Sequence, residues 1–283
     1  MTSQELKAAA KSFGADLVGI ASTASLAYLP KEDNPLSIFP QAKNVIIIGR
    51  KIPRGALRGI EQGTEMDNSF AQFGFIDLED NFLAKTTYDV NIWMEARGFE
   101  AVPLFAYDCT GQPVGVPVEP GKPAPNVILQ YRIMAQAAGL GETGLNGLFL
   151  TPEFGPRQRF AMLLTDAEMK ADKPFQPYLC KDCGKCVPAC PLQALSPENG
   201  TKAGFAGCES LVAARDNDLC RRCRNGAFVT NEGRFSTVER VAAACSRACI
   251  AALEERGAIQ EKFTHLFRQS APWGRDIVGD KVQ

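Results

Sequence analysis

The chain has 283 residues, of which 45% are hydrophobic and 22% charged, enough to build the core of one large domain or two smaller ones. Its formal net charge of -1 gives no support for a general nucleic-acid binder, which usually presents a basic face. There is no apolar run of about 18 residues and no basic and apolar leader at the N-terminus, so we expect no membrane span and a cytoplasmic location.

The N-terminal part of the chain alternates between predicted helices and strands. Thr2 and Glu5 have the spacing of a capping box, which predicts a helix that ends before Gly14. Apolar and β-branched runs predict strands over Asp16–Ala21, Lys43–Gly49 and Phe99–Tyr107, the second of them buried on both faces. Helical spacing predicts a long helix over Asn68–Arg97, ended by Gly98.

The middle of the chain opens with a loop, Pro113–Pro125, rich in proline and glycine. Asn126 is suited to cap a helix over Val127–Ala138, and strands are predicted over Leu145–Leu150 and Arg159–Thr165. We therefore expect an α+β fold with one domain over residues 1–170 and a second over residues 171–283. The second domain includes a helix over Phe235–Arg256.

Three glycines after that predicted helix, Gly139, Gly141 and Gly144, spell G-x-G-x-x-G. A dinucleotide-binding fingerprint follows a strand and opens a helix, whereas this one follows a helix and leads into a strand. We interpret it as a helix-to-strand turn whose backbone can approach a ligand closely.

Nine of the ten cysteines fall between Cys180 and Cys249, while Cys109 stands alone and is interpreted as a small buried residue. In a reducing cytoplasm such a group indicates metal binding rather than disulfides. Only one histidine, His265, is present, so sulfur must supply most of the ligands.

The first four of these cysteines have the spacing C-x2-C-x2-C-x3-C and are followed by Pro191, which is the run of bacterial ferredoxins. Three thiolates wrap one [4Fe–4S] cluster, and the fourth reaches a second cluster. Zinc is the main rival, but its sites usually pair two C-x2-C hairpins across a longer spacer. The four cysteines are Cys180, Cys183, Cys186 and Cys190.

Two clusters need four more thiolates, and five cysteines are available for them. Cys220 and Cys223 form one pair and Cys245 and Cys249 another, which leaves Cys208 as a spare unless it replaces a member of the last pair. The basic residues Arg221, Arg222 and Arg224 around the first pair are interpreted as a solvated charged turn.

The segment Ala137–Met169 followed by CKDCGKCVPACP resembles the corrinoid iron–sulfur reductases, namely the epoxyqueuosine reductases and the reductive dehalogenases. The resemblance implies a nitroreductase-like α/β domain that holds cobalamin, followed by a ferredoxin-like domain with two [4Fe–4S] clusters. It also implies a corrin lined by residues of the glycine turn and the segment after it. These are Gly139, Leu140, Gly141, Gly144, Asn146, Gly147 and Thr151.

The sequence departs from this family at the proton donor. Epoxyqueuosine reductases have an acidic residue shortly before the helix that enters the glycine turn, and Lys122–Asn126 has none. The nearest replacements are Tyr107, Asp108 and Tyr131. The helical-repeat extension of many tRNA-acting members is also missing, so we expect a small-molecule substrate rather than nucleic acid.

Three functions remain open. The first is a cobalamin-dependent reductase that takes electrons from a low-potential donor such as ferredoxin or flavodoxin, in anaerobic chemistry. The second is an electron-transfer or activating protein for a corrinoid partner, without a substrate site of its own. The third is a module that stores or delivers corrinoid.

Overall fold

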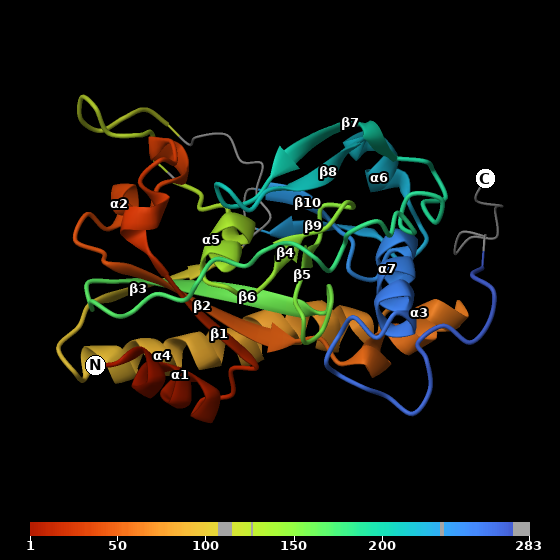
Figure 1. Ribbon diagram of the computed structural model, residues 1–283, viewed down its shortest axis with the longest axis horizontal. Helices are drawn as coiled ribbons and strands as arrows, with labels where there is room; N and C mark the ends of the chain where they lie inside the picture. The colour runs from red at the N-terminus through yellow and green to blue at the C-terminus, as the bar shows by residue number, and fades with distance from the viewer. Residues whose placement is uncertain (107–114, 126, 233–234, 274–283) are drawn as a thin grey trace. The chain divides into compact units, whose positions relative to one another are not determined.

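A computed structural model describes residues 1–106, 115–125, 127–232 and 235–273, and it mixes helices with strands as expected (Figure 1). Tyr107, Asp108, Cys109 and Asn126 lie outside the described residues. The chain forms two compact units with interleaved segments. The first unit comprises Met1–Arg50, Glu79–Leu140 and Arg159–Phe175, and the second comprises Lys51–Leu78, Gly141–Gln158 and Gln176–Gln283. The domain boundary at residue 170 stays a prediction.

The first unit is built on a four-stranded sheet in the order β1-β2-β6-β3. β1 pairs antiparallel with β2, and β3 pairs antiparallel with β6. β2 is buried over Asn44–Gly49, so the prediction that both of its faces are covered is confirmed. The strands are β1 (Leu17–Ser22), β2 (Asn44–Lys51), β3 (Ala101–Phe105) and β6 (Gln158–Thr165).

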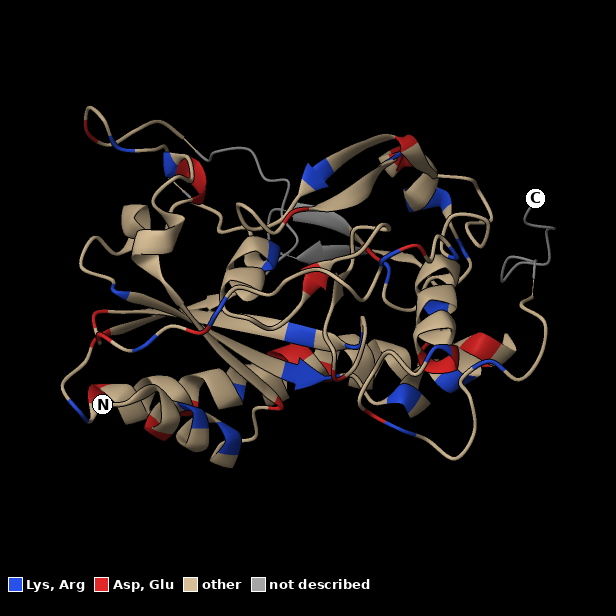
Figure 2. Cartoon of the chain, viewed as in Figure 1, with Lys and Arg blue, Asp and Glu red and all other residues tan. Residues whose placement is uncertain are grey.

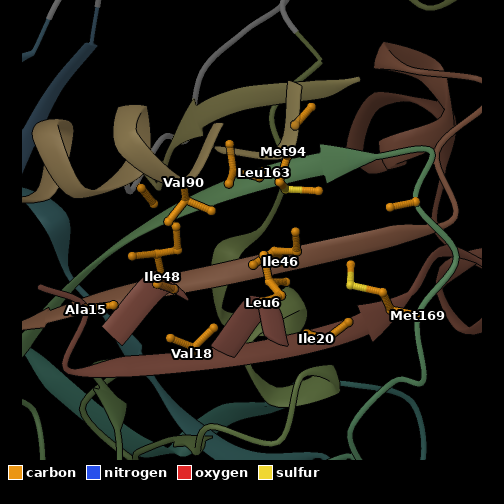
Figure 3. Packing of buried hydrophobic residues seen from close by; sticks show 14 of the residues in the cluster. Leu6, Ala15, Val18, Ile20, Ile46, Ile48, Val90, Met94, Leu163 and Met169 are labelled. Carbon is orange, nitrogen blue, oxygen red and sulfur yellow. The ribbon is translucent and has the colours of Figure 1, made fainter. Parts of the chain in front are cut away.

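The core of this unit lies between the sheet and the helices α1 (Ser3–Ser12) and α4 (Ala84–Glu95) (Figure 3). The predicted capping box is confirmed, because Thr2 N donates to Glu5 Oε2 at 2.7 Å and Glu5 N donates to Thr2 Oγ1 at 3.2 Å. Side chains from both helices and from the sheet meet in one apolar cluster that includes Leu6, Ile20, Ile46, Val90 and Leu163.

Helix α5 (Tyr131–Ala137) packs against β1, and it is shorter than the predicted helix. Ile128 N donates to Glu32 O at 3.1 Å instead of joining the helix, so the helix begins only after the extended Gln130. A Cβ added at Gly19 would lie 2.5 Å from Ala138 O, so glycine allows this close packing. The remaining elements here are η1 (Thr23–Leu26), η2 (Lys31–Asp33) and α2 (Pro35–Ile38).

The predicted long helix over Asn68–Arg97 is interrupted. α4 is preceded by two π-helical segments, η4 (Ala71–Ile76) and η5 (Leu78–Leu83), and the helical part closes at Gly98 with φ 81°. Among the described helices none is long and apolar enough to cross a membrane.

The second unit consists of three antiparallel strand pairs and several helices. Its strands are β4 (Glu142–Thr143), β5 (Phe149–Leu150), β7 (Leu195–Ala203), β8 (Ser210–Arg215), β9 (Phe228–Glu232) and β10 (Phe235–Glu239). Its helices are η3 (Arg54–Leu57), α3 (Arg58–Gln62), α6 (Asn217–Arg222) and α7 (Ala244–Glu255).

Two sequence expectations are wrong in this unit. Only Phe149–Leu150 of the strand expected over Leu145–Leu150 is extended, because the residues before it form a tight turn in which Gly147 N donates to Gly144 O at 2.8 Å. The helix expected over Phe235–Arg256 starts at Ala244, because Phe235–Glu239 pairs with Phe228–Glu232 as a hairpin. Both segments contain a phenylalanine and two adjacent β-branched residues, which favour strands.

Candidate metal centre

The loop that carries the first cysteines is a chain of tight turns. Cys183 N donates to Cys180 O at 3.3 Å and Cys190 N donates to Val187 O at 3.1 Å. Asp182 and Gly184 have φ of 57° and 62°, the left-handed conformation that lets the backbone curl. The thiols are thereby presented on successive turns of one short loop.

A first group of four cysteines lines one enclosed space. Cys180, Cys183 and Cys186 come from the loop, and Cys249 comes from α7. The thiolate of Cys249 interacts electrostatically with the other three, most strongly with Cys180. The last pair therefore contributes Cys249 to the first group.

A second group joins the fourth cysteine of the run to the later ones. Cys190 interacts electrostatically with Cys220, Cys223 and Cys245. Cys220 lies on α6, Cys223 caps that helix, and Cys245 lies in the first turn of α7. The exchange of the fourth ligand between two groups is the pattern of two-cluster ferredoxins.

Cys208 does not line the space of the first group. Its thiol accepts a hydrogen bond from Gln176 Nε2 at 3.0 Å, and the residue is buried. Within the described part of the chain no three Cys, His, Asp or Glu side chains are close enough to bind a single metal ion. Each iron of a cubane takes its own thiolate, whereas the thiolates of a zinc site converge on one ion.

Burial makes six thiols of the two groups poor acids without a metal. It raises the pKa of Cys186 to about 12 and that of Cys223 to about 11. Burial also raises the pKa of Cys180, Cys245 and Cys249. Metal binding must therefore release protons, and the positive charge of iron supplies the driving force.

Glu142 holds the beginning of the cysteine loop, and sequence reasoning missed it. Its buried carboxylate accepts backbone N–H bonds from Tyr178 at 2.5 Å, Leu179 at 3.1 Å and Cys180 at 2.7 Å. Leu145 N, from the turn that follows Glu142, donates to Cys180 Sγ at 3.1 Å. The signal available was that Glu142 is the only charged residue between Gly139 and Leu150.

A cavity of about 520 Å³ opens beside the first cysteine group. Its wall combines Cys180 and Cys183 with Glu142, Leu145 and the exposed Tyr178. Cavities of a few hundred Å³ with mostly apolar walls are typical of small-molecule and cofactor sites.

The residues expected to line a corrin are distributed over both units. Gly139 and Leu140 end the second segment of the first unit, and the others belong to the second. Thr151 is fully buried and donates to Gln158 Oε1 at 3.1 Å. Asn146 lines the enclosed space of the first cysteine group.

Of the three expected proton donors, only Tyr131 is described. It is half-buried at the start of α5, and its ring lies 6.1 Å from the ring of Phe160 and 4.8 Å from the Arg132 guanidinium. These contacts all lie within the first unit.

A family model described as a 4Fe-4S binding domain matches residues 174–196, which include the first cysteine run. Tetrachloroethene reductive dehalogenase of Desulfitobacterium hafniense is 36% identical over 123 residues, 42% of this chain and 19% of the dehalogenase. Epoxyqueuosine reductase of Synechocystis sp. is 23% identical over 180 residues, 63% of this chain and 55% of the reductase. The matches thus span about half or less of these relatives.

Solved structures show the same fold. A reductive dehalogenase described in connection with B12-dependent dehalogenation matches with a TM-score of 0.55 and 20% identity, over 87% of this chain and 30% of its own. Epoxyqueuosine reductase from Streptococcus thermophilus matches with a TM-score of 0.51 and 17% identity, over 78% of this chain and 61% of its own. Over the matched parts the chain is similar to the epoxyqueuosine reductases and the reductive dehalogenases, and its first cysteine run matches a 4Fe-4S binding domain.

Proposed function

We propose that the chain is an iron–sulfur oxidoreductase that passes low-potential electrons through two [4Fe–4S] clusters to a bound cobalamin, which reduces a small substrate. The observation that carries the proposal is the division of eight cysteines into two groups of four, the first of which opens on a cavity. This reading leaves Cys208 outside both clusters.

The residues present fit two cubanes. Soft thiol donors are buried together with backbone N–H groups that bond to sulfur, as Ala194 N does to Cys190 Sγ at 3.3 Å. Such bonds and the exclusion of water tune the potential of a cluster. The chain's own work is to hold the clusters, shield them and deliver electrons.

The cavity beside Cys180 and Cys183 would receive the edge of a corrin, and the first unit would supply the nitroreductase-like part of the fold. None of the seven residues expected to line the corrin borders this cavity. Cobalamin, when bound, supplies a cobalt ion that can take up electrons and reduce a substrate. Leu145 and Tyr178 would shield that edge from water. The glycines of the turn serve close packing of the chain itself, because a Cβ added at Gly139 would lie 2.7 Å from Lys173 O and one added at Gly141 would overlap Leu150 O.

The test is anaerobic purification with added cobalamin, followed by desalting and joint measurement of iron, sulfide and corrinoid. We expect about eight irons per chain and a retained corrinoid absorbance. Zinc in place of iron would overturn the proposal. Full iron without retained corrinoid would favour an electron carrier for a corrinoid partner instead.

The substrate class needs its own measurement. One solved epoxyqueuosine reductase was determined together with an epoxyqueuosine-modified tRNA stem loop. On α6 the basic Arg221 and Arg222 follow the acidic Asp218, and the charges are mixed along this element (Figure 2). We expect no tRNA binding at physiological salt, which fluorescence anisotropy with labelled tRNA would check.

A further inference from the structure

Asn146 and Arg240 form a bonded pair that links the two cysteine groups. Arg240 Nη1 donates to Asn146 O at 2.8 Å, and both residues are only 3% exposed. A Cβ added at Gly147 would lie 3.5 Å from Arg240 Nη2, so the guanidinium packs against the turn backbone. Each member of the pair has a buried nitrogen, Nδ2 of Asn146 and Nη2 of Arg240, that donates no hydrogen bond to any described group.

The amide of Asn146 faces the first group. Its Oδ1 accepts a hydrogen bond from Leu148 N at 3.1 Å, which fixes the orientation of the amide. Its Nδ2 is buried and has no acceptor among the described residues. Asn146 lines the same enclosed space as Cys180 and Cys249.

The guanidinium of Arg240 acts on the second group. The side chain of Arg240 interacts electrostatically with Cys220 and Cys245, and its backbone O accepts a hydrogen bond from Ala243 N at 3.0 Å, directly before the start of α7, which carries Cys245. No carboxylate of the described chain forms an ion pair with Arg240, whereas the buried Arg247 is neutralised by Glu61 at 2.8 Å. The positive charge of Arg240 is therefore left to compensate the cysteine group beside it.

We propose that Asn146 and Arg240 are positioning residues that set the potentials of the two clusters separately, Asn146 as an N–H donor to the first cluster and Arg240 as a charged donor to the second. The inference rests on the proposed function, because it needs both clusters. A donor to sulfur stabilises the extra negative charge of the reduced cluster and so raises its potential. A buried cation does this more strongly than a neutral amide.

The test is an anaerobic redox titration of the full chain, followed by electron paramagnetic resonance. Arg240→Gln is expected to lower the midpoint potential of one cluster by about 59 mV. This shift corresponds to about a tenfold change in the equilibrium constant for one-electron reduction. Asn146→Asp keeps the acceptor for Leu148 N but removes the donor, and it is expected to lower the other midpoint. Arg240→Lys keeps the positive charge, so the midpoint potential lowered in Arg240→Gln should stay close to the wild-type value in this variant. The control is Arg222→Gln, whose exposed charge beside Cys223 is screened by water.

The iron content shows whether a negative result refutes the proposed function or only this inference. Wild-type protein without about eight irons per chain refutes the proposed function itself. With iron intact, an Arg240→Gln variant that leaves both midpoints in place, or moves both equally, overturns this inference alone. If the Arg240→Gln variant loses iron, the Asn146→Asp variant provides the test instead. Midpoint potentials of both clusters that are unchanged in Asn146→Asp would then overturn the inference.

Discussion

Replacement of Glu142 by glutamine should loosen the first cysteine group. The carboxylate accepts three backbone N–H bonds from Tyr178, Leu179 and Cys180, at 2.5, 3.1 and 2.7 Å. Glutamine keeps one acceptor oxygen and turns an NH2 group toward an N–H donor. Since a hydrogen bond to a charged group contributes about 1.5–3 kcal/mol, we expect the loop to lose about 2–3 kcal/mol of stability.

The assay is the anaerobic transfer of iron to a chelator. If the loop must open before iron leaves, this loss speeds the transfer by about 30- to 140-fold, at about 1.4 kcal/mol for each factor of ten. The matched control is Glu255→Gln, an exposed glutamate on α7, which should leave the rate unchanged. A Glu142→Gln rate within about twofold of wild type, less than about 0.5 kcal/mol, would refute the reasoning.

Four further substitutions test the second unit. Cys208→Ala should keep the full iron content and Cys249→Ala should lose at least one cluster's iron; equal iron in both variants would contradict the assignment of ligands. Glu61→Ala leaves the buried Arg247 without the carboxylate 2.8 Å away, so the free energy of unfolding should fall by about 3–5 kcal/mol in denaturant titrations, and a change under about 1 kcal/mol would speak against this ion pair. Burial of Glu261 would raise its pKa, but hydrogen bonds from a lysine and an arginine outweigh it, so the pKa lies below the ordinary 4.5. This carboxylate therefore stabilises the fold above pH 4.5 and loses that contribution as pH falls through its lowered pKa. Glu261→Gln should remove this part of the acid sensitivity, and unfolding curves of equal pH dependence in variant and wild type would show the reasoning to be wrong.

Local sequence determined the elements whose signals are short-range. The capping box at Thr2, the buried strand over Asn44–Gly49 and the left-handed residue Gly98 each follow from neighbouring residues. The same holds for the tight loop over Cys180–Cys190, where ligand spacing and backbone curl belong to one segment. The predicted helix over Phe235–Arg256 was wrong at its start, because Phe235–Glu239 pairs with the strand that directly precedes it in the chain.

Long-range contacts were decided only by the tertiary structure. The spacing of the later cysteines is equally compatible with several ligand sets, and only the structure shows Cys249 in the space lined by the loop cysteines and Cys245 in electrostatic interaction with Cys190 and Cys220. The hydrogen bond from Cys180 to Glu142 spans 38 residues, and that from Arg240 to Asn146 spans 94. Spacing records which residues are neighbours along the chain, whereas a cluster site collects donors and charges that only folding brings together.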